Sequence, residues 1–251
     1  MLLAVIALGE LVFFAYLVAT YGRSTLAGDV SAWSRFSAHG WVAGDPVGNA
    51  AMASHVLLAA AVLLAGAVQL LPVVRRRLPR LHRWSGRMFL SGCVVAAVSG
   101  LWLVWGRGTV GDGPQHVAIS LNALLLAVCT GWAWYTARTR QFGRHRDWAL
   151  RAYLVAGGVF YFRILLALWL LLFRRPVGFD AETFSGPFLT LLAFSVYVFA
   201  PLMLYEAYRR AAPVVRGAAA RLLALALSLL ALTCCAGVLS AVVALWLPKL
   251  R

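Results

Sequence analysis

Two stretches of the sequence place a histidine among arginines where the chain turns apolar. The first is "RRRLPRLHRWSGRMF", residues 75–89, which contains His82; the second is "RQFGRHRDWALRAY", residues 140–153, with His145 in nearly the same frame. A basic loop at a membrane surface needs no histidine, because arginine alone supplies the charge. Imidazole is, however, a common ligand of metal ions and of haem iron. The two histidines are therefore candidates for such a site.

Two further histidines form a matching pair. His55 and His116 each stand near the start of an apolar stretch and lie 61 residues apart, while His82 and His145 lie 63 residues apart. The tryptophan and arginine that follow His82 also recur after His145. We interpret this as a weak internal repeat of two helical hairpins. Repeats are common in membrane folds, so repetition alone indicates duplication and not chemistry.

The composition indicates that membrane helices position these residues. The 251 residues are 63% hydrophobic and 12% charged, about half the charge of a soluble domain. Runs of about 20 apolar residues are long enough to cross the hydrocarbon core. Seven runs qualify: 2–21, 50–72, 88–106, 116–137, 149–173, 187–208 and 219–247.

The runs predict the fold class and the domain organisation. They lack the alternation of a membrane barrel, so we expect an all-α, polytopic membrane helical bundle of about seven helices. Helices two to five, within residues 50–173, should form a four-helix core from two repeated hairpins. Residues 187–247 should add two C-terminal helices, so that 1–251 is a single integral membrane domain. The first run contains Glu10 and lacks a basic start, so we expect a retained helix and not a cleaved signal.

The net charge of +15 is unevenly distributed. Residues 73–87 hold six arginines, residues 138–151 five and residues 209–221 four, all in alternate loops. The positive-inside rule therefore predicts that these loops are cytoplasmic. The protein should be a multi-pass component of the inner (plasma) membrane with a cytoplasmic N-terminus and an outer C-terminus. Its partner is then the lipid bilayer and not nucleic acid.

The predicted topology places the histidines at two depths. His55 and His116 fall near the outer ends of helices two and four, and His82 and His145 near the inner ends of helices three and five. Small residues dominate the face that each histidine heads, which suits close helix packing and also leaves room for a macrocycle. Two histidines on separate helices can hold a b-type haem with no open position. We therefore predict one or two haem b groups and electron transfer across the membrane.

Three arginines could accompany these haems. Arg163 lies 18 residues beyond His145, which predicts the depth of the outer pair. A buried arginine needs a partner, either an outer haem propionate or Glu10. Arg83 and Arg87 could serve the inner propionates or an anionic donor, or act only as positive-inside signals.

The histidine layout resembles a known family. "LHRWSG" is similar to the "LH-S-W-x-G" stretch of the cytochrome b-561 family, over about residues 50–165. That resemblance implies an outer haem held by helices two and four, here His55 and His116, and a cytoplasmic one held by helices three and five, here His82 and His145. "HRWSGRMF" and "HRDWALRAY" also resemble a bacterial membrane-protein family, domain-of-unknown-function family 2306, which implies no activity.

Two other classes of function stay open at this point. One is a non-redox transporter or channel that uses Glu10 and Arg163 along a solute path. The other is a membrane scaffold whose arginine loops grip anionic headgroups. The sequence also leaves open whether this is an enzyme of the transmembrane oxidoreductase kind, whether the reductant is quinol or another small molecule, and whether the chain forms a homodimer.

Overall fold

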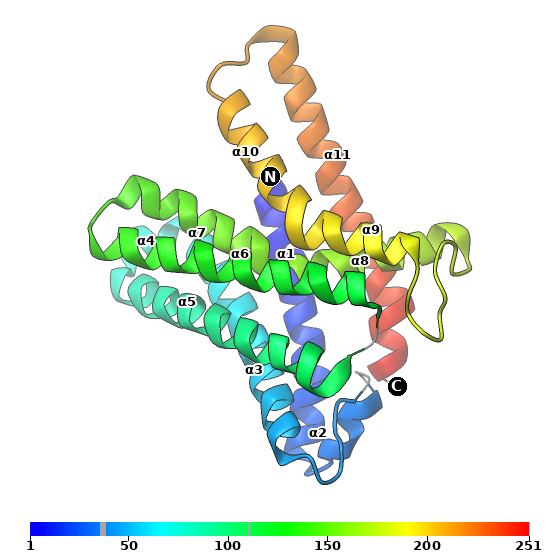
Figure 1. Cartoon of the computed structure of the whole chain (residues 1–251). Helices are drawn as coiled ribbons and strands as arrows, with labels where there is room; N and C mark the ends of the chain where they lie inside the picture. Colours follow the sequence, from blue (N-terminus) through cyan, green and yellow to red (C-terminus); the bar gives the residue numbers. More distant parts are fainter. Residues whose placement is uncertain (36–38, 110, 251) are drawn as a thin grey trace.

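A computed structural model describes residues 1–35, 39–109 and 111–250, and nearly all of them are helical (Figure 1). Within these residues, six helical segments are long and apolar enough to cross a membrane, and a bent pair of helices counts as a seventh. The prediction of an all-α, polytopic membrane bundle with about seven spans is therefore confirmed.

The first repeated hairpin starts at a sequence-encoded cap. The Asp45 carboxylate accepts a hydrogen bond from the Gly48 amide at 2.8 Å, and Pro46 takes the first helical position. Leu71 is extended, so the chain leaves the helix there and turns back. The elements of this hairpin are α3 (Pro46–Leu70), the short α4 (Pro72–Arg77), α5 (Pro79–Trp102) and the π-helical η3 (Leu103–Gly108).

The second hairpin starts in the same way but turns more tightly. Asp112 caps α6 (Gly113–Arg138) by accepting a hydrogen bond from the Gln115 amide at 3.1 Å. Arg140 adopts a positive φ of 58° in the turn. The chain then enters α7 (Phe142–Ala156) without the extra short helix of the first hairpin.

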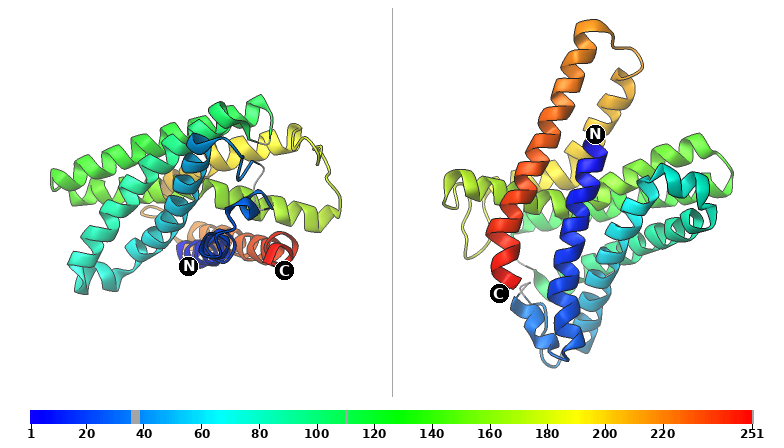
Figure 2. Two further views of the ribbon diagram at one scale, coloured as in Figure 1. Left: turned by 90° about the horizontal axis from the view of Figure 1, so that it is seen from below. Right: turned by 180° about the vertical axis from the view of Figure 1, so that it is seen from behind.

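The two hairpins pack against each other. Helix α5 packs against both α3 and α6, and α6 packs against α7. The ring of Tyr153 on α7 reaches α3 at Gly66, where an added Cβ would lie 3.1 Å from the ring. Figure 2 shows these helices from two further sides. Phe89, Cys93 and Ala152 are among the side chains that fill the interior.

The predicted helix at 149–173 is bent. It divides into α7 and α8 (Gly158–Phe173), which meet at 45°. The Asn122 amide donates hydrogen bonds to the Val155 carbonyl at 3.2 Å and to the Tyr197 carbonyl at 2.8 Å. The Val155 carbonyl lies at the bend, where the regular helical hydrogen bonds are interrupted. The Tyr197 carbonyl lacks its helical donor because Pro201, four residues later, has no N–H. Asn122 therefore satisfies two backbone groups that lipid could not.

The first and last spans lie side by side. Helix α1 (Leu2–Leu17) packs against α3 and against α11 (Gly217–Ala241), which also covers α8. Figure 2 shows that α1 and α11 run in the same direction. The remaining elements are η1 (Val18–Gly22), α2 (Arg23–Leu26), η2 (Val30–Arg35), α9 (Pro187–Phe194), η4 (Ser195–Phe199), α10 (Ala200–Ala211), η5 (Val242–Trp246) and η6 (Leu247–Leu250).

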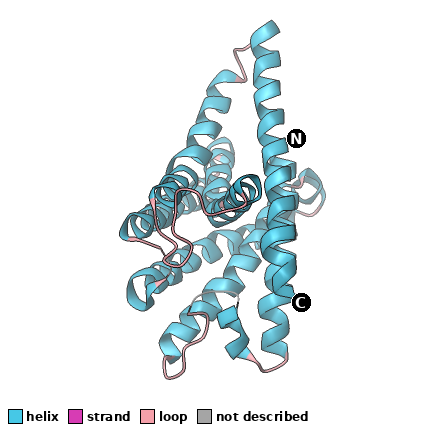
Figure 3. Cartoon of the chain, turned by 90° about the vertical axis from the view of Figure 1, so that its right-hand side faces the viewer, coloured by secondary structure: helices cyan, strands magenta, loops and turns pink. Residues whose placement is uncertain are grey.

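The arginine-rich turns lie away from the other loops. In Figure 1, α4 and the α6–α7 turn lie at the left and the α10–α11 turn at the top, whereas α2 and the C-terminus lie below. Figure 3 shows that the α10–α11 hairpin extends beyond the rest of the molecule. At the opposite end, Arg107 pairs with Asp45 at 3.4 Å, and the Gln115 amide donates to the Phe184 carbonyl at 3.0 Å. The arginine-rich turns thus lie apart from the other loops, and the predicted orientation in the membrane stays a prediction.

Candidate functional site

The predicted inner histidines lie at corresponding places on two helices. His82 is in the first turn of α5 and His145 in the first turn of α7, so both are helical residues at the arginine-rich end. Both side chains are half-buried. The two imidazoles are within electrostatic reach of each other. The structure therefore brings this pair together from two separate helices.

Backbone contacts orient the inner pair. His145 Nδ1 lies 2.9 Å from the Ala133 carbonyl oxygen. Because a carbonyl only accepts, Nδ1 carries the proton and Nε2 keeps its lone pair, the arrangement common in metal-bound histidine. On α5, the Gln69 amide donates to the His82 carbonyl at 2.8 Å and holds its backbone. The buried Nδ1 of His82 has no hydrogen-bond partner among the described residues.

His55 is oriented in the same manner but faces α5. Its Nδ1 lies 3.0 Å from the Ala96 carbonyl oxygen and 3.3 Å from the Ser99 hydroxyl. Gly100 allows this approach, since an added Cβ there would lie 3.0 Å from the imidazole Cε1. The small residues predicted on this face of α5 thus accommodate the ring of His55.

His116 packs against an aromatic neighbour. Its ring meets the Trp105 indole edge-on, with centroids 5.8 Å apart. The Trp105 Nε1–H donates to Ser120 at 2.9 Å, which fixes the indole beside the histidine. The buried Nε2 of His116 has no hydrogen-bond partner in the described part of the chain. His55 and His116 share one end of the bundle, and no contact between the two is observed in the described residues.

Arg163 is near His55, and Glu10 is not its partner. Its guanidinium lies 5.3 Å from the centroid of the Phe13 ring and within electrostatic reach of His55. This agrees with the predicted depth. No carboxylate among the described residues lies within ion-pair distance of Arg163, so the alternative that Glu10 neutralises it is wrong. The bend after Ala156 explains why Arg163 and Glu10 do not meet, because Arg163 lies on α8 and not on a straight continuation of α7.

Arg83 and Arg87 lie on α5 near its arginine-rich start. Both side chains are exposed, and neither forms an ion pair within the described ranges. Arg83 lies within electrostatic reach of His82. Arg151, the repeat counterpart of Arg87, is instead half-buried and paired with Glu206. The duplicated arginines therefore have different surroundings.

The histidine pairs offer the donor atoms that a haem iron needs, but the structure has no open space for the porphyrin beside them among the described residues. One hollow of about 330 Å³ lies between α5 and α6, and another of about 320 Å³ lies among α6, α7 and α10. Neither is lined by a histidine. The interior near Gly66 is filled by Phe89 and Tyr153. For a porphyrin to lie between the two histidines of a pair, neighbouring side chains and their helices must therefore move apart.

Sequence reasoning missed a polar cluster at the bend. Glu10 is 1% exposed, lies beside the Tyr153 hydroxyl, and its Oε1 would be 2.9 Å from a Cβ on Gly157. Its Oε2 and the hydroxyls of Tyr153 and Tyr161 lack a hydrogen bond of normal geometry among the described residues. The acidic residue in an apolar run was visible in the sequence, but the tyrosines around it were not.

A comparison with protein families matches the chain to a family of membrane proteins. The model described as "Predicted membrane protein (DUF2306)" matches residues 52–181, just over half of the chain, including all four histidines of the two pairs. No curated protein and no solved structure matches the chain significantly.

Proposed function

Because the chain belongs to the DUF2306 family of predicted membrane proteins, whose description gives no activity, we propose its function from its own residues: electron transfer across the membrane through b-type haem held by histidine pairs. The protein is a polytopic membrane protein, and the haem, the electron donor and the acceptor are parts of the proposal.

The placement of His82 and His145 carries the proposal. They come from α5 and α7 to the same end of the bundle, within electrostatic reach of each other. His145 is held through Nδ1 to a backbone carbonyl and leaves Nε2 free, and His82 has a buried nitrogen with no partner among the described residues. Two imidazoles on separate helices are the donor set of a six-coordinate haem.

The outer pair would hold a second group nearer the opposite face. The Ala96 carbonyl accepts from Nδ1 of His55, which leaves Nε2 of His55 free to bind iron. Nε2 of His116 is buried and has no hydrogen-bond partner among the described residues. Arg163 near His55, and Arg83 near His82, provide cations at the two ends where propionates need them. A haem at each end would supply one-electron transfer, with quinol or another small reductant as the donor.

A reduced-minus-oxidised absorbance spectrum of the detergent-purified protein tests the proposal. We expect low-spin b-type bands, and we expect His82→Ala and His145→Ala each to remove the same haem, so that the double variant loses no more than either one. His39→Ala is the matched control, because His39 lies outside the helices and should leave the spectrum intact. A colourless protein, or a full spectrum in His82→Ala, would contradict the inner site.

A second candidate function is favoured by Glu10. A carboxyl that is 1% exposed inside a bundle is costly and usually functional. It lies at the bend between α7 and α8, and broken helices commonly form ion sites in transporters. We propose as the alternative a proton-transport path through Glu10.

Proton uptake into proteoliposomes separates the two functions. With a potassium-diffusion potential, the alternative predicts uptake by colourless protein and its loss in Glu10→Gln. Glu182→Gln is the control, because Glu182 is exposed in the 174–186 loop and forms no ion pair among the described residues. Absence of uptake in the unaltered protein would exclude the alternative without bearing on the haem spectrum.

A further inference from the structure

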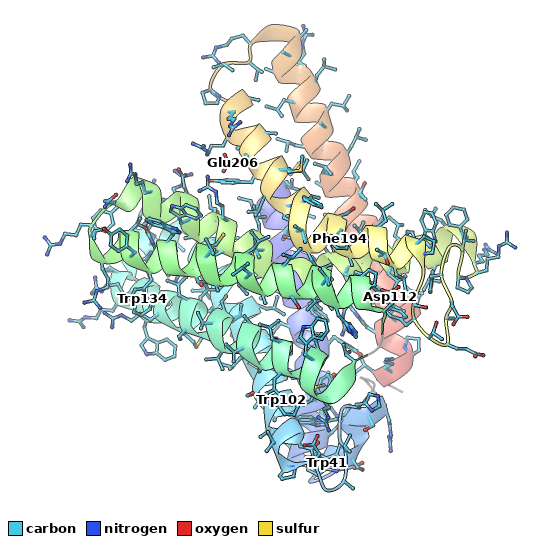
Figure 4. All side chains as sticks on the ribbon, in the orientation of Figure 1. Trp41, Trp102, Asp112, Trp134, Phe194 and Glu206 are labelled. Carbon is cyan, nitrogen blue, oxygen red and sulfur yellow. The ribbon has the colours of Figure 1, made fainter. Side chains whose placement is uncertain are left out.

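A basic, aromatic hollow opens where the α6–α7 turn meets α10. Its volume is about 320 Å³. Figure 4 labels Glu206, the α10 residue that connects this helix to α7 beside the hollow. It therefore joins two of the three arginine-rich segments of the chain. The lining residues are Trp132, Thr136, Arg144, Asp147, Trp148, Arg151 and Arg209.

Two of the three arginines that line the hollow are held in place by one carboxylate. Arg151 Nε donates to Glu206 Oε1 at 2.9 Å, and its terminal nitrogen contacts the same oxygen. Arg209 donates from Nε and Nη2 to the other oxygen, Oε2, at 3.2 and 3.0 Å. Glu206 thus has two arginines around one acidic group, which is the geometry that also binds phosphate.

The charges of the hollow do not balance. Three guanidinium groups line it, against the carboxylates of Asp147 and Glu206. Among the described residues, Arg144 donates only to the neutral Gln141 side chain, at 3.1 Å, and it is exposed. One positive charge therefore remains available, which matches the single negative charge of a phosphodiester.

Aromatic rings form an apolar wall beside these charges. The indoles of Trp132 and Trp148 are stacked, with centroids 5.8 Å apart and planes at 17°. The Arg151 guanidinium lies 4.8 Å from the Trp148 ring centroid, so it is fixed by a cation–π contact as well as by its ion pair. Trp132 is 48% exposed, on the outer surface of the bundle. Tryptophan at this position is typical of the membrane interface.

We propose that this hollow binds the phosphodiester of an anionic phospholipid. Arg144 and Arg209 contact the phosphate, Arg151 is positioned behind them by Glu206 and Trp148, and the exposed Trp132 face covers the glycerol and the upper acyl chain. Basic pockets between helices at the cytoplasmic surface are known to select anionic headgroups. The apolar wall favours a lipid over free phosphate. This site is separate from the histidine pairs and does not rest on the haem proposal.

Native mass spectrometry and thermal melting of the full chain in neutral detergent test the proposal. We expect phosphatidylglycerol to remain bound and to raise the melting temperature, and phosphatidylcholine and inorganic phosphate to do neither. Arg144→Gln should reduce phosphatidylglycerol retention at least five-fold, and Arg209→Gln should reduce it similarly. Arg144 contributes no ion pair within the described residues, so its variant should fold normally.

Arg216→Gln is the matched control. Arg216 lies in the neighbouring turn, bonds only to backbone carbonyls within the described residues, and does not line the hollow. An equal loss of phosphatidylglycerol in Arg216→Gln would show that general surface charge is responsible and overturn the site. Equal stabilisation by inorganic phosphate would overturn the lipid assignment, and equal retention of phosphatidylcholine would overturn the need for an anionic headgroup.

Discussion

At the scale of single residues, backbone carbonyls select which imidazole nitrogen is free. The Ala133 carbonyl lies against Nδ1 of His145, and the Ala96 carbonyl against Nδ1 of His55. A carbonyl cannot donate, so both rings are held in the tautomer that leaves Nε2 as a lone-pair donor. Each acceptor belongs to a different helix from its histidine, so the packing of the hairpins presets both side chains.

Variants of Arg83 and Arg87 separate the effect of nearby charge on the proposed haem from the effect of losing an iron ligand. We expect Arg83→Gln and Arg87→Gln to keep the haem and to lower its midpoint potential, because a nearby positive charge favours the reduced, more negative state. A unit charge about 12 Å away is worth about 1.4 kcal/mol at an effective dielectric of about 20, or about 60 mV at most. Potentiometric titration against Arg216→Gln measures this, and unchanged potentials in both variants would leave only a topological role for these arginines.

Asp180 should make the 174–186 loop sensitive to acid. Its carboxylate accepts hydrogen bonds from the Thr183 amide at 2.8 Å and the Glu182 amide at 2.9 Å. These bonds, with the Thr183 amide first, hold the pKa of Asp180 below its ordinary value. Because the pKa of Asp180 is lower in the folded loop, the ionised carboxylate stabilises the loop at pH values above its ordinary pKa of about 4. This stabilisation is lost as the pH falls through the pKa of the folded state.

Amide hydrogen exchange of this loop checks the expectation. Protection at Glu182 and Thr183 should be constant above about pH 5 and should fall as the pH drops below about 4. Asp180→Asn can still accept the bonds but cannot titrate, so its protection should show no such step. A step of equal size in Asp180→Asn would assign the acid sensitivity to another group.

At the scale of elements, two interrupted helices share one donor. The Asn122 amide on α6 satisfies the Val155 carbonyl at the end of α7 and the Tyr197 carbonyl ahead of Pro201. Gly158 makes room for this junction, since an added Cβ would lie 2.7 Å from the Tyr197 ring. The bend and the proline therefore persist without unpaired carbonyls at these two positions.

Replacing Asn122 should loosen the junction. Asn122→Leu leaves two carbonyls without a donor in an apolar interior, at a cost of about 1–3 kcal/mol for each carbonyl. We expect the melting temperature in detergent to fall by about 5 °C. Ser91→Ala is the control, because the Ser91 hydroxyl is exposed and bonds only within its own helix. A melting temperature as high as that of the control would show that the junction is held by other contacts.

At the scale of the whole molecule, the direction of the spans agrees with an odd number of crossings. Helices α1 and α11 pack together and run in the same direction (Figure 2). The hollow beside Glu206 brings Arg144 and Arg209 together from separate turns. The positive-inside rule then predicts that this end is cytoplasmic.

Labelling of single-cysteine variants in intact cells tests this orientation. In a background without the four native cysteines, an impermeant maleimide should label Glu182→Cys but should not label Pro79→Cys or Val214→Cys. All three positions should react after the cells are permeabilised. Labelling of Pro79→Cys before permeabilisation would reverse the predicted orientation.

The sequence by itself determined the features that depend on local chemistry. Apolar runs of sufficient length predicted the spans, because burial in hydrocarbon depends on composition and length and not on partners. The apolar runs placed the starts of the second and fourth spans at 50 and 116, whereas α3 and α6 begin a few residues earlier, directly after the capping carboxylates of Asp45 and Asp112. The alternating arginines and the histidine spacing predict which loops and which histidines lie towards the same face of the membrane, and these remain predictions.

Only the tertiary structure decided which faces meet. The sequence allowed Glu10 to pair with Arg163, yet the bend after Ala156 directs Arg163 to Phe13 and leaves Glu10 beside the tyrosines. Likewise, Arg151 finds Glu206 55 residues away, while its repeat counterpart Arg87 remains exposed. Such contacts depend on helix rotation and crossing, which arise from the packing of many side chains at once. A periodic pattern along one helix does not contain that information.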